Sequence, residues 1–216
     1  MILTKNAKIV FAGDSVTDDG RKYPVGEGDG LGNGYVSLID TFLAVDYPEL
    51  NLHLVNMGIG GNTSRDLLAR WDTDVNALNP DRVVVLIGIN DVWRQFDSPT
   101  NPEASVLPEE YESNLNAICD NTKAKLIFMT PYYLETNVND AMRKRCDEYA
   151  AICKKVANAR DIPVIDLQAA FEQILKYRYP AYIMWDRVHP GRIGSMIIAR
   201  AFLQKIGYVP KYDFKV

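Results

Sequence analysis

The sequence predicts an α/β protein, a three-layer α/β/α sandwich built around a five-stranded parallel sheet. Short apolar runs alternate with longer amphipathic segments along the whole chain, which is the pattern of repeated βαβ units. The run over residues 83–87 is entirely aliphatic, which indicates a strand buried on both faces, as in parallel sheets. No repeat, low-complexity tract or linker interrupts the alternation, so residues 1–216 are expected to form one domain.

The individual elements follow from apolar runs and from residues that start or stop helices. Strands are expected at the apolar runs 8–12, 52–55, 83–87, 126–129 and 164–165. Helices are expected at the amphipathic segments 35–46, 64–78, 108–121, 140–159, 167–176 and 191–206. Pro48 stops the first helix, Thr63 or Ser64 caps the second, and Pro108 suits the first turn of the third. The glycine-rich residues 26–34 are expected to form a loop.

The composition limits the partners and the compartment. With 24 basic and 28 acidic residues the formal charge is -4, and no basic run provides a nucleic-acid surface. No apolar stretch has the length of a membrane span, and the first five residues do not resemble a signal peptide. Cys146 and Cys153 would lie roughly 10 Å apart along one helix, too far to bridge. With Cys119 they are expected to stay reduced, which favours a cytoplasmic protein.

Polar residues follow the predicted strands at the edge where open α/β sheets bind ligands. Ser15 follows the first strand, Gly61 lies in the segment after the second, and Asn90 comes just after the third. Asp186 and His189 precede the last predicted helix. If the sheet is wound as predicted, these five residues converge on one edge.

Their chemistry is that of ester hydrolysis, which needs a nucleophile, a base, a group that orients the base, and oxyanion donors. We expect Ser15 to be the nucleophile, His189 the base and Asp186 the carboxylate that holds the imidazole. The oxyanion hole is expected to use the backbone N–H groups of Ser15 and Gly61 and the side-chain amide of Asn90. Because His189 must be neutral to accept a proton, activity should fall at acid pH.

Each residue alone also fits a structural role. Ser15 suits a helix cap, the glycines near Gly61 a tight turn, and Asn90 a turn-and-cap position. Asp186 and His189 suit a surface ion pair. The ordered set of all of them favours catalysis. The second histidine, His53, lies inside a predicted strand and is expected to be packed.

Four short blocks of the sequence resemble those of the SGNH (GDSL-type) hydrolases. They are residues 13–15 (Gly-Asp-Ser), 61–63 (Gly-Asn-Thr), 88–91 (Gly-Ile-Asn-Asp) and 186–189 (Asp-Arg-Val-His). The four letters of the family name fall on Ser15, Gly61, Asn90 and His189. Asn62 departs mildly from the pattern, since many members carry aspartate there. The resemblance implies a flavodoxin-like sandwich and a serine esterase.

A narrower likeness extends over residues 24–28, 34–35, 90–94 and 185–190, which look like intracellular acetylxylan esterases of this superfamily. The resemblance implies removal of acetyl groups from xylo-oligosaccharides or similar acetylated sugars. It further implies that no metal or other cofactor is needed and that the protein is a homo-oligomer.

Candidate substrate-binding residues are Asp14, Trp93, Tyr182 and Trp185. Sugar rings stack on aromatic faces, and these rings lie in or near predicted post-strand loops. Most aromatic residues of these loops are nevertheless expected to pack under the loops or at a subunit interface. Trp185, directly before the acid of the triad, is the one most expected to line the pocket. Whether Arg94 or Arg187 contacts substrate stays open.

Other functions remain open at this point. A lysophospholipase or thioesterase of the same superfamily would act on longer acyl chains. A metal-dependent phosphoesterase would use Asp14, Asn90, Asp91 and His189 as ligands, but such sites usually gather several histidines. A carbohydrate-binding protein without catalysis would not need Ser15, Asp186 and His189 together.

Overall fold

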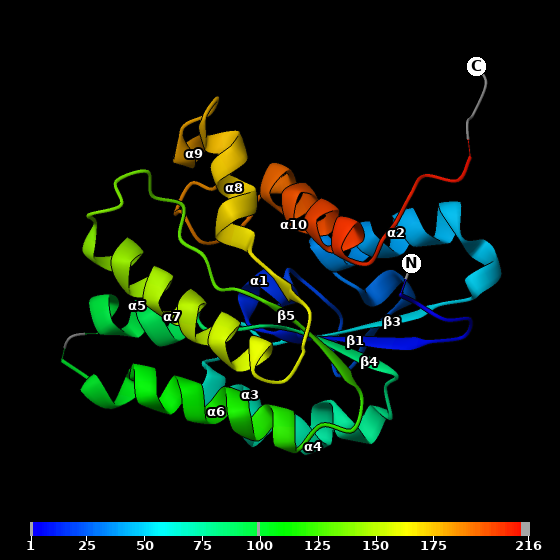
Figure 1. Cartoon of the computed structure of the whole chain (residues 1–216), viewed down its shortest axis with the longest axis horizontal. Coiled ribbons are helices and arrows are strands. Elements are labelled where there is room, and N and C mark those ends of the chain that lie inside the picture. The colour runs from blue at the N-terminus through cyan, green and yellow to red at the C-terminus, as the bar shows by residue number, and fades with distance from the viewer. Residues whose placement is uncertain (1, 99, 213–216) are drawn as a thin grey trace.

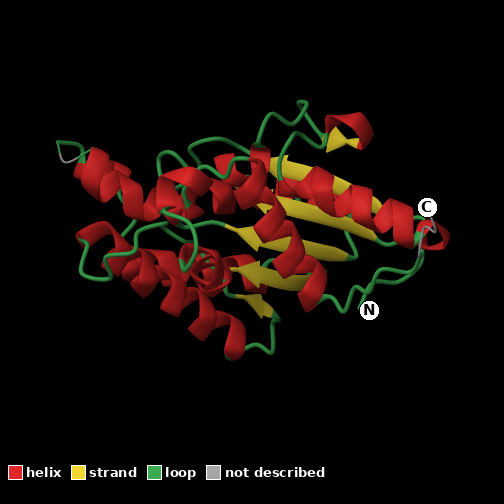
Figure 2. Ribbon diagram, turned by 90° about the horizontal axis from the view of Figure 1, so that it is seen from above, coloured by secondary structure: helices red, strands yellow, loops and turns green. Residues whose placement is uncertain are grey.

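The fold is built on a six-stranded sheet, in a computed structural model that describes residues 2–98 and 100–212. The strands are β1 (Lys8–Gly13), β2 (Gly26–Glu27), β3 (His53–Gly58), β4 (Arg82–Leu86), β5 (Lys125–Met129) and β6 (Val164–Ile165). Their order across the sheet is β2-β3-β1-β4-β5-β6. All neighbours are parallel except β2, which runs antiparallel to β3. Figure 2 shows the longer strands side by side with their arrowheads toward the same end of the molecule.

Helices cover both faces of this sheet (Figure 1). The α-helices are α1 (Ser15–Asp18), α2 (Tyr35–Asp46), α3 (Ser64–Ala69), α4 (Trp71–Asp74), α5 (Ile89–Asp97), α6 (Pro108–Asp120), α7 (Ala141–Asn158), α8 (Leu167–Leu175), α9 (Pro180–Ile183) and α10 (Arg192–Lys205). Short 3₁₀ turns lie at η1 (Gly28–Gly30), η2 (Pro48–Leu50), η3 (Asn76–Leu78) and η4 (Pro102–Ala104). The layer of α2, α8 and α10 lies on one side, and that of α3, α4, α6 and α7 on the other. The three-layer α/β/α prediction is therefore confirmed.

The five predicted parallel strands are present, and β2 is an addition at the edge. It lies in the segment that the sequence predicts to be a loop, and two residues are too few to produce an alternating pattern. Gly26 is required there, because a Cβ would come within 2.9 Å of the Asn56 carbonyl oxygen on β3. The sheet thus has six strands, and the predicted number of five was wrong.

Three local expectations differ from the structure. The single helix over residues 64–78 is divided into α3, α4 and η3, because Arg70 leaves helical geometry at φ -102° and ψ 7°. No helix is expected between the predicted strand 83–87 and the predicted helix 108–121, but the chain forms α5 there. His53 is exposed at the start of β3 and lies 3.4 Å from Glu27, so the expectation of a packed ring was wrong.

The core has two parts, one on each face of the sheet. Side chains alternate along β1, where Ile9 and Phe11 enter the cluster under α2 and α10, and Val10 enters the cluster on the opposite face. Along β4, Val83 and Val84 divide in the same way. The aliphatic run is therefore buried on both faces, as its composition predicts.

The strand register brings the carboxyl ends of β1, β3 and β4 to the same edge of the sheet. Gly13 at the end of β1 is opposite Gly58 on β3 and Leu86 on β4, so the chain leaves all three strands at one level. Within the described residues, 2–98 and 100–212, no helix is both long enough and apolar enough to cross a bilayer.

Candidate active site

Ser15 lies at the point where β1 turns into α1. Asp14 caps this helix, with Oδ1 accepting the backbone N–H of Val16 at 2.9 Å. Gly13 permits the turn, because a Cβ there would overlap the carbonyl oxygen of Leu86 on β4. Oγ of Ser15 lies 2.8 Å from Nε2 of His189, although the two residues are 174 positions apart.

The loop before α10 brings His189 and Asp186 together. Nδ1 of His189 lies 2.6 Å from Oδ2 of Asp186. Oδ1 of Asp186 accepts the backbone N–H groups of Val188 at 3.0 Å and of His189 at 2.8 Å. Burial acts to raise the pKa of Asp186, but the hydrogen bonds from the His189 ring and from these two N–H groups lower it below its ordinary value. The carboxylate is therefore ionised near neutral pH and oriented by three donors.

The three residues predicted to be catalytic thus form one hydrogen-bonded line. An ionised Asp186 favours the tautomer with a proton on Nδ1 of His189, which leaves the Nε2 lone pair directed at Ser15. A hydroxyl held against a neutral imidazole in this way can be deprotonated as it attacks a carbonyl carbon.

The predicted oxyanion donors come from Ser15 itself, from Gly61 in the loop between β3 and α3, and from Asn90 on α5. In the described part of the chain, neither the N–H of Ser15 nor that of Gly61 has a protein acceptor. The side-chain amide of Asn90, in the first turn of α5, donates one hydrogen to the carbonyl of Asn62 at 3.0 Å and keeps a second. Gly61 has φ +80°, a left-handed conformation that glycine adopts without strain.

Arg70, which sequence reasoning missed, fixes the loop that carries Gly61. Its guanidinium donates to Oδ1 of Asn62 at 2.7 Å, to the carbonyl of Met57 at 2.9 Å and to the carbonyl of Gly13 at 2.9 Å. One side chain therefore joins the ends of β1 and β3 to the loop between β3 and α3. Asn62, the position that departs from the family pattern, is the acceptor in this contact.

Asp91 and Asp14 have their own structural contacts. The Asp91 carboxylate accepts the N–H of Ser64 at 3.0 Å and also its hydroxyl, which ties α5 to the start of α3. Asp14 is only 1% exposed, and its Oδ2 has no partner. Capping α1 is the role its contacts give it, so the geometry speaks against direct substrate binding. Among the described residues, no three His, Cys, Asp or Glu side chains gather as a metal site.

The two buried carboxyls make stability depend on pH. Burial raises the pKa of Asp14 and of Asp91 to about 7. In the unfolded chain both titrate at ~3.9. Between these values the folded state holds protons that the unfolded state has lost, so the stability they contribute falls as the pH rises through this window. Asp186, with its lowered pKa, acts in the opposite sense and only at more acid pH.

We therefore expect the free energy of unfolding to decrease from pH 5 to pH 8. Urea unfolding at one-unit intervals measures it. Asp91→Asn should show a smaller slope than wild type, whereas Asp29→Asn, at an exposed position, should not alter the slope. A free energy of unfolding that rises over this interval would contradict the argument.

The other expected substrate-binding residues are Trp93, Tyr182 and Trp185. The Trp93 ring centroid lies 5.9 Å from that of His189. Trp185 is 82% exposed, and Tyr182 is half-exposed on α9. Nη2 of Arg94 lies 3.8 Å from the position that a Cβ on Gly61 would occupy, so this guanidinium borders the predicted oxyanion hole. Arg187 instead pairs with Glu135 at 2.6 Å.

Asn90→Ala should lower kcat by about 10²–10³-fold, because one oxyanion donor is lost, while KM changes little. Steady-state rates on an acetyl ester measure both constants. Asn116→Ala is the matched control, since Asn116 likewise donates its amide to a backbone carbonyl, that of Glu112 on α6. An unchanged kcat in Asn90→Ala would remove Asn90 from the oxyanion hole.

Known proteins resemble this chain over nearly its whole length. The chain is 48% identical over 213 residues to an acetylxylan esterase of Geobacillus stearothermophilus, covering 96% of this chain and 97% of the relative. The crystal structure of the acetylxylan esterase Axe2 from that organism matches with a TM-score of 0.96 and 47% identity, over 99% of this chain and 100% of the other. The thioesterase 1/protease 1/lysophospholipase L1 of Escherichia coli K12 is 28% identical over 190 residues, which cover 86% of this chain and 84% of that protein.

Solved structures of Axe2 include three described as catalytic mutants, in which a serine, an aspartate and a histidine are each replaced by alanine. In Axe2 that aspartate and histidine are three positions apart. Residues 11–197 of this chain match the model of the GDSL-like lipase/acylhydrolase family. The chain therefore belongs to that family and is a carboxylic ester hydrolase of the SGNH type.

Proposed function

We propose that this enzyme removes acetyl groups from xylo-oligosaccharides or similar acetylated sugars through an acyl-enzyme on Ser15. The observation that carries the reaction type is the hydrogen-bonded line from Ser15 through His189 to Asp186. The sugar substrate is supported by 48% identity to an acetylxylan esterase. No metal or other cofactor takes part in this scheme.

In the first half of the reaction, Nε2 of His189 takes the proton of the Ser15 hydroxyl while Oγ forms a bond to the acetyl carbon. The carbonyl oxygen becomes an oxyanion, which accepts hydrogen bonds from the N–H of Ser15, the N–H of Gly61 and the Asn90 amide. The bond between the acetyl carbon and the sugar oxygen then breaks. Nε2 of His189 gives its proton to that oxygen, and the free sugar hydroxyl departs.

In the second half, water attacks the acetyl-serine ester. Nε2 of His189 takes a proton from this water, and the same donors hold the second oxyanion. When the bond to Oγ breaks, His189 returns the proton to Ser15 and acetate leaves. Throughout both halves, Asp186 keeps the ring oriented and stabilises its positive charge.

Three aromatic residues are proposed to bind the sugar. Trp93 lies against the His189 ring, and Trp185 presents an exposed ring directly before Asp186. Tyr182 lies on α9, three residues before Trp185. We propose further that residues 1–216 act as one domain, that the enzyme is a cytoplasmic homo-oligomer, and that nucleic acids and membranes are not its partners.

A panel of esters tests the substrate. Wild type and Ser15→Ala are assayed on acetylated xylo-oligosaccharides, on acetylated non-sugar alcohols, and on p-nitrophenyl acetate and octanoate. We expect hydrolysis of the acetylated sugars and strong preference for acetate over octanoate, with all activity lost in Ser15→Ala.

Preference for octanoate would instead support an enzyme for longer acyl chains, the alternative to which the 28% identity to the Escherichia coli thioesterase points. Labelling of Ser15 by an organophosphonate separates both enzymes from a carbohydrate-binding protein, because only an activated serine reacts.

A further inference from the structure

The loop that carries Asp186 and His189 is held by three contacts from the segment after β5, in which Tyr132 and Leu134 are buried. The Tyr132 hydroxyl donates to the carbonyl of Val188 at 2.8 Å, and the N–H of Leu134 donates to the carbonyl of Arg187 at 3.0 Å. The third contact is an ion pair at 2.6 Å between Nη1 of Arg187 and Oε2 of Glu135. Two of these contacts use the backbone of the loop, and the third uses the side chain of Arg187.

Arg187 occupies an unfavourable position between the acid and the base. Its φ is +68°, in the left-handed region that side chains other than those of glycine, asparagine and aspartate rarely adopt. This turn places Asp186 where its carboxylate accepts the N–H groups of Val188 and His189. A backbone held in such a conformation needs neighbours that define it.

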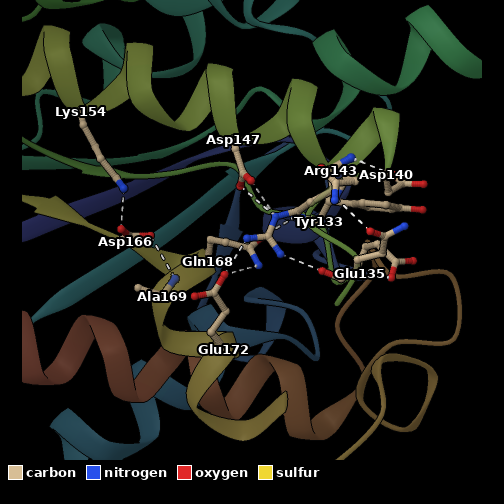
Figure 3. Close-up of polar contacts among 12 residues, drawn as sticks. Tyr133, Glu135, Asp140, Arg143, Asp147, Lys154, Asp166, Gln168, Ala169 and Glu172 are labelled. Atoms are coloured by element: carbon tan, nitrogen blue, oxygen red, sulfur yellow. Dashed lines mark hydrogen bonds and ion pairs between the residues drawn. The ribbon is translucent and has the colours of Figure 1, made fainter. Parts of the chain in front are cut away.

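Glu135, which pairs with Arg187, is itself held in place by several contacts. Its side chain is 13% exposed, and its Oε1 accepts the N–H of Asn137 at 2.8 Å. The carbonyl of Glu135 accepts Nη1 of Arg143 at 2.7 Å. Arg143, 6% exposed on α7, also pairs with Asp147 at 2.9 Å and with Glu172 of α8 at 2.6 Å (Figure 3). Residue 135 is therefore held by Arg143 of α7, which is itself paired with α8.

We propose that Glu135 and Arg187 are positioning residues, whose ion pair holds the turn so that Asp186 and His189 stay in line with Ser15. The Arg187 side chain is 44% exposed, and ion pairs of such exposure contribute little to stability. The reaction rate depends much more strongly on the position of the catalytic base, since a displacement of about 1 Å can lower a rate by ~10²-fold. The pair should therefore matter for turnover rather than for folding. This inference rests on the proposed serine mechanism.

Arg187→Gly separates the ion pair from the backbone strain. Glycine accepts φ +68° and lacks the guanidinium, so the midpoint of thermal unfolding should stay constant or rise. On p-nitrophenyl acetate we expect kcat to fall by about 10–100-fold and KM to change less than about twofold. Labelling of Ser15 by an organophosphonate should slow in proportion, because that reaction needs the aligned histidine but no sugar.

Two further variants complete the design. Glu135→Gln keeps the size of the side chain and removes its charge, so it should lower kcat in the same direction and add little in the Arg187→Gly background. Asp161→Gly is the matched control: Asp161 has φ +54° and is exposed before β6, at the edge of the sheet away from the site. It should leave kcat unchanged.

Three results would overturn the proposal. An unchanged kcat in both Arg187→Gly and Glu135→Gln would show that the pair does not position the loop. A raised KM with unchanged kcat in Arg187→Gly would make Arg187 a substrate-binding residue. Equal and additive losses in the double variant would show that the two residues act separately. Because these assays use an aryl acetate, failure on acetylated sugars would refute the proposed substrate without affecting this comparison.

Discussion

Ser15→Ala is expected to lower kcat by roughly 10⁴–10⁶-fold, because the attacking oxygen is removed and no acyl-enzyme can form. Among the described residues, Oγ of Ser15 has one hydrogen-bond partner, Nε2 of His189. The residue that caps α1 is Asp14 and not Ser15. The substitution should therefore leave folding and substrate binding nearly intact. Initial rates on an acetyl ester, with enzyme in large excess over any contaminating esterase, measure the loss.

The control for this variant is its thermal unfolding midpoint, together with substrate binding measured by calorimetry. Both should match wild type. A variant that is folded, binds substrate and keeps a tenth of the wild-type rate would mean that another group attacks the ester. The mechanism built on Ser15 would then be wrong.

Asp186→Asn is expected to lower kcat by about 10³–10⁴-fold with little loss of fold. The Asp186 carboxylate accepts from Nδ1 of His189 at 2.6 Å, which keeps a proton on Nδ1 and a lone pair on Nε2. An asparagine amide directed at Nδ1 would favour the opposite tautomer, with Nε2 protonated and facing the Ser15 hydroxyl. The base could then no longer accept the serine proton.

Steady-state kinetics of Asp186→Asn across pH 5 to 9 test this argument. Asp120→Asn is the matched control, because it makes the same change in an exposed ion pair with Arg160 at the far end of α6. The control should keep wild-type activity. A loss in Asp186→Asn of less than about tenfold would show that the carboxylate does not select the tautomer.

The sequence predicts most of the framework because local patterns encode it. Apolar runs place the five parallel strands, and Pro108 marks the first turn of α6. The elements that it misses are those without a local signal. β2 is too short for a pattern, and the first turn of α5 holds Asn90 and Asp91, whose burial depends on contacts with distant segments such as the start of α3. The prediction that His53 is packed was wrong because the apolar pattern does not show that β3 begins at the surface.

The sequence by itself determined which groups can do the chemistry: a serine after the first strand, a glycine and an asparagine after the next two, and an aspartate three residues before a histidine. Tertiary structure decided how they meet. Ser15 and His189 are 174 positions apart, and their distance of 2.8 Å depends on the register of β1, β3 and β4. The contacts of Arg70 with the carbonyl of Gly13 and of Glu135 with Arg187 could not be predicted from the sequence either. Polar contacts between distant segments depend on packing and produce no periodic pattern in the sequence.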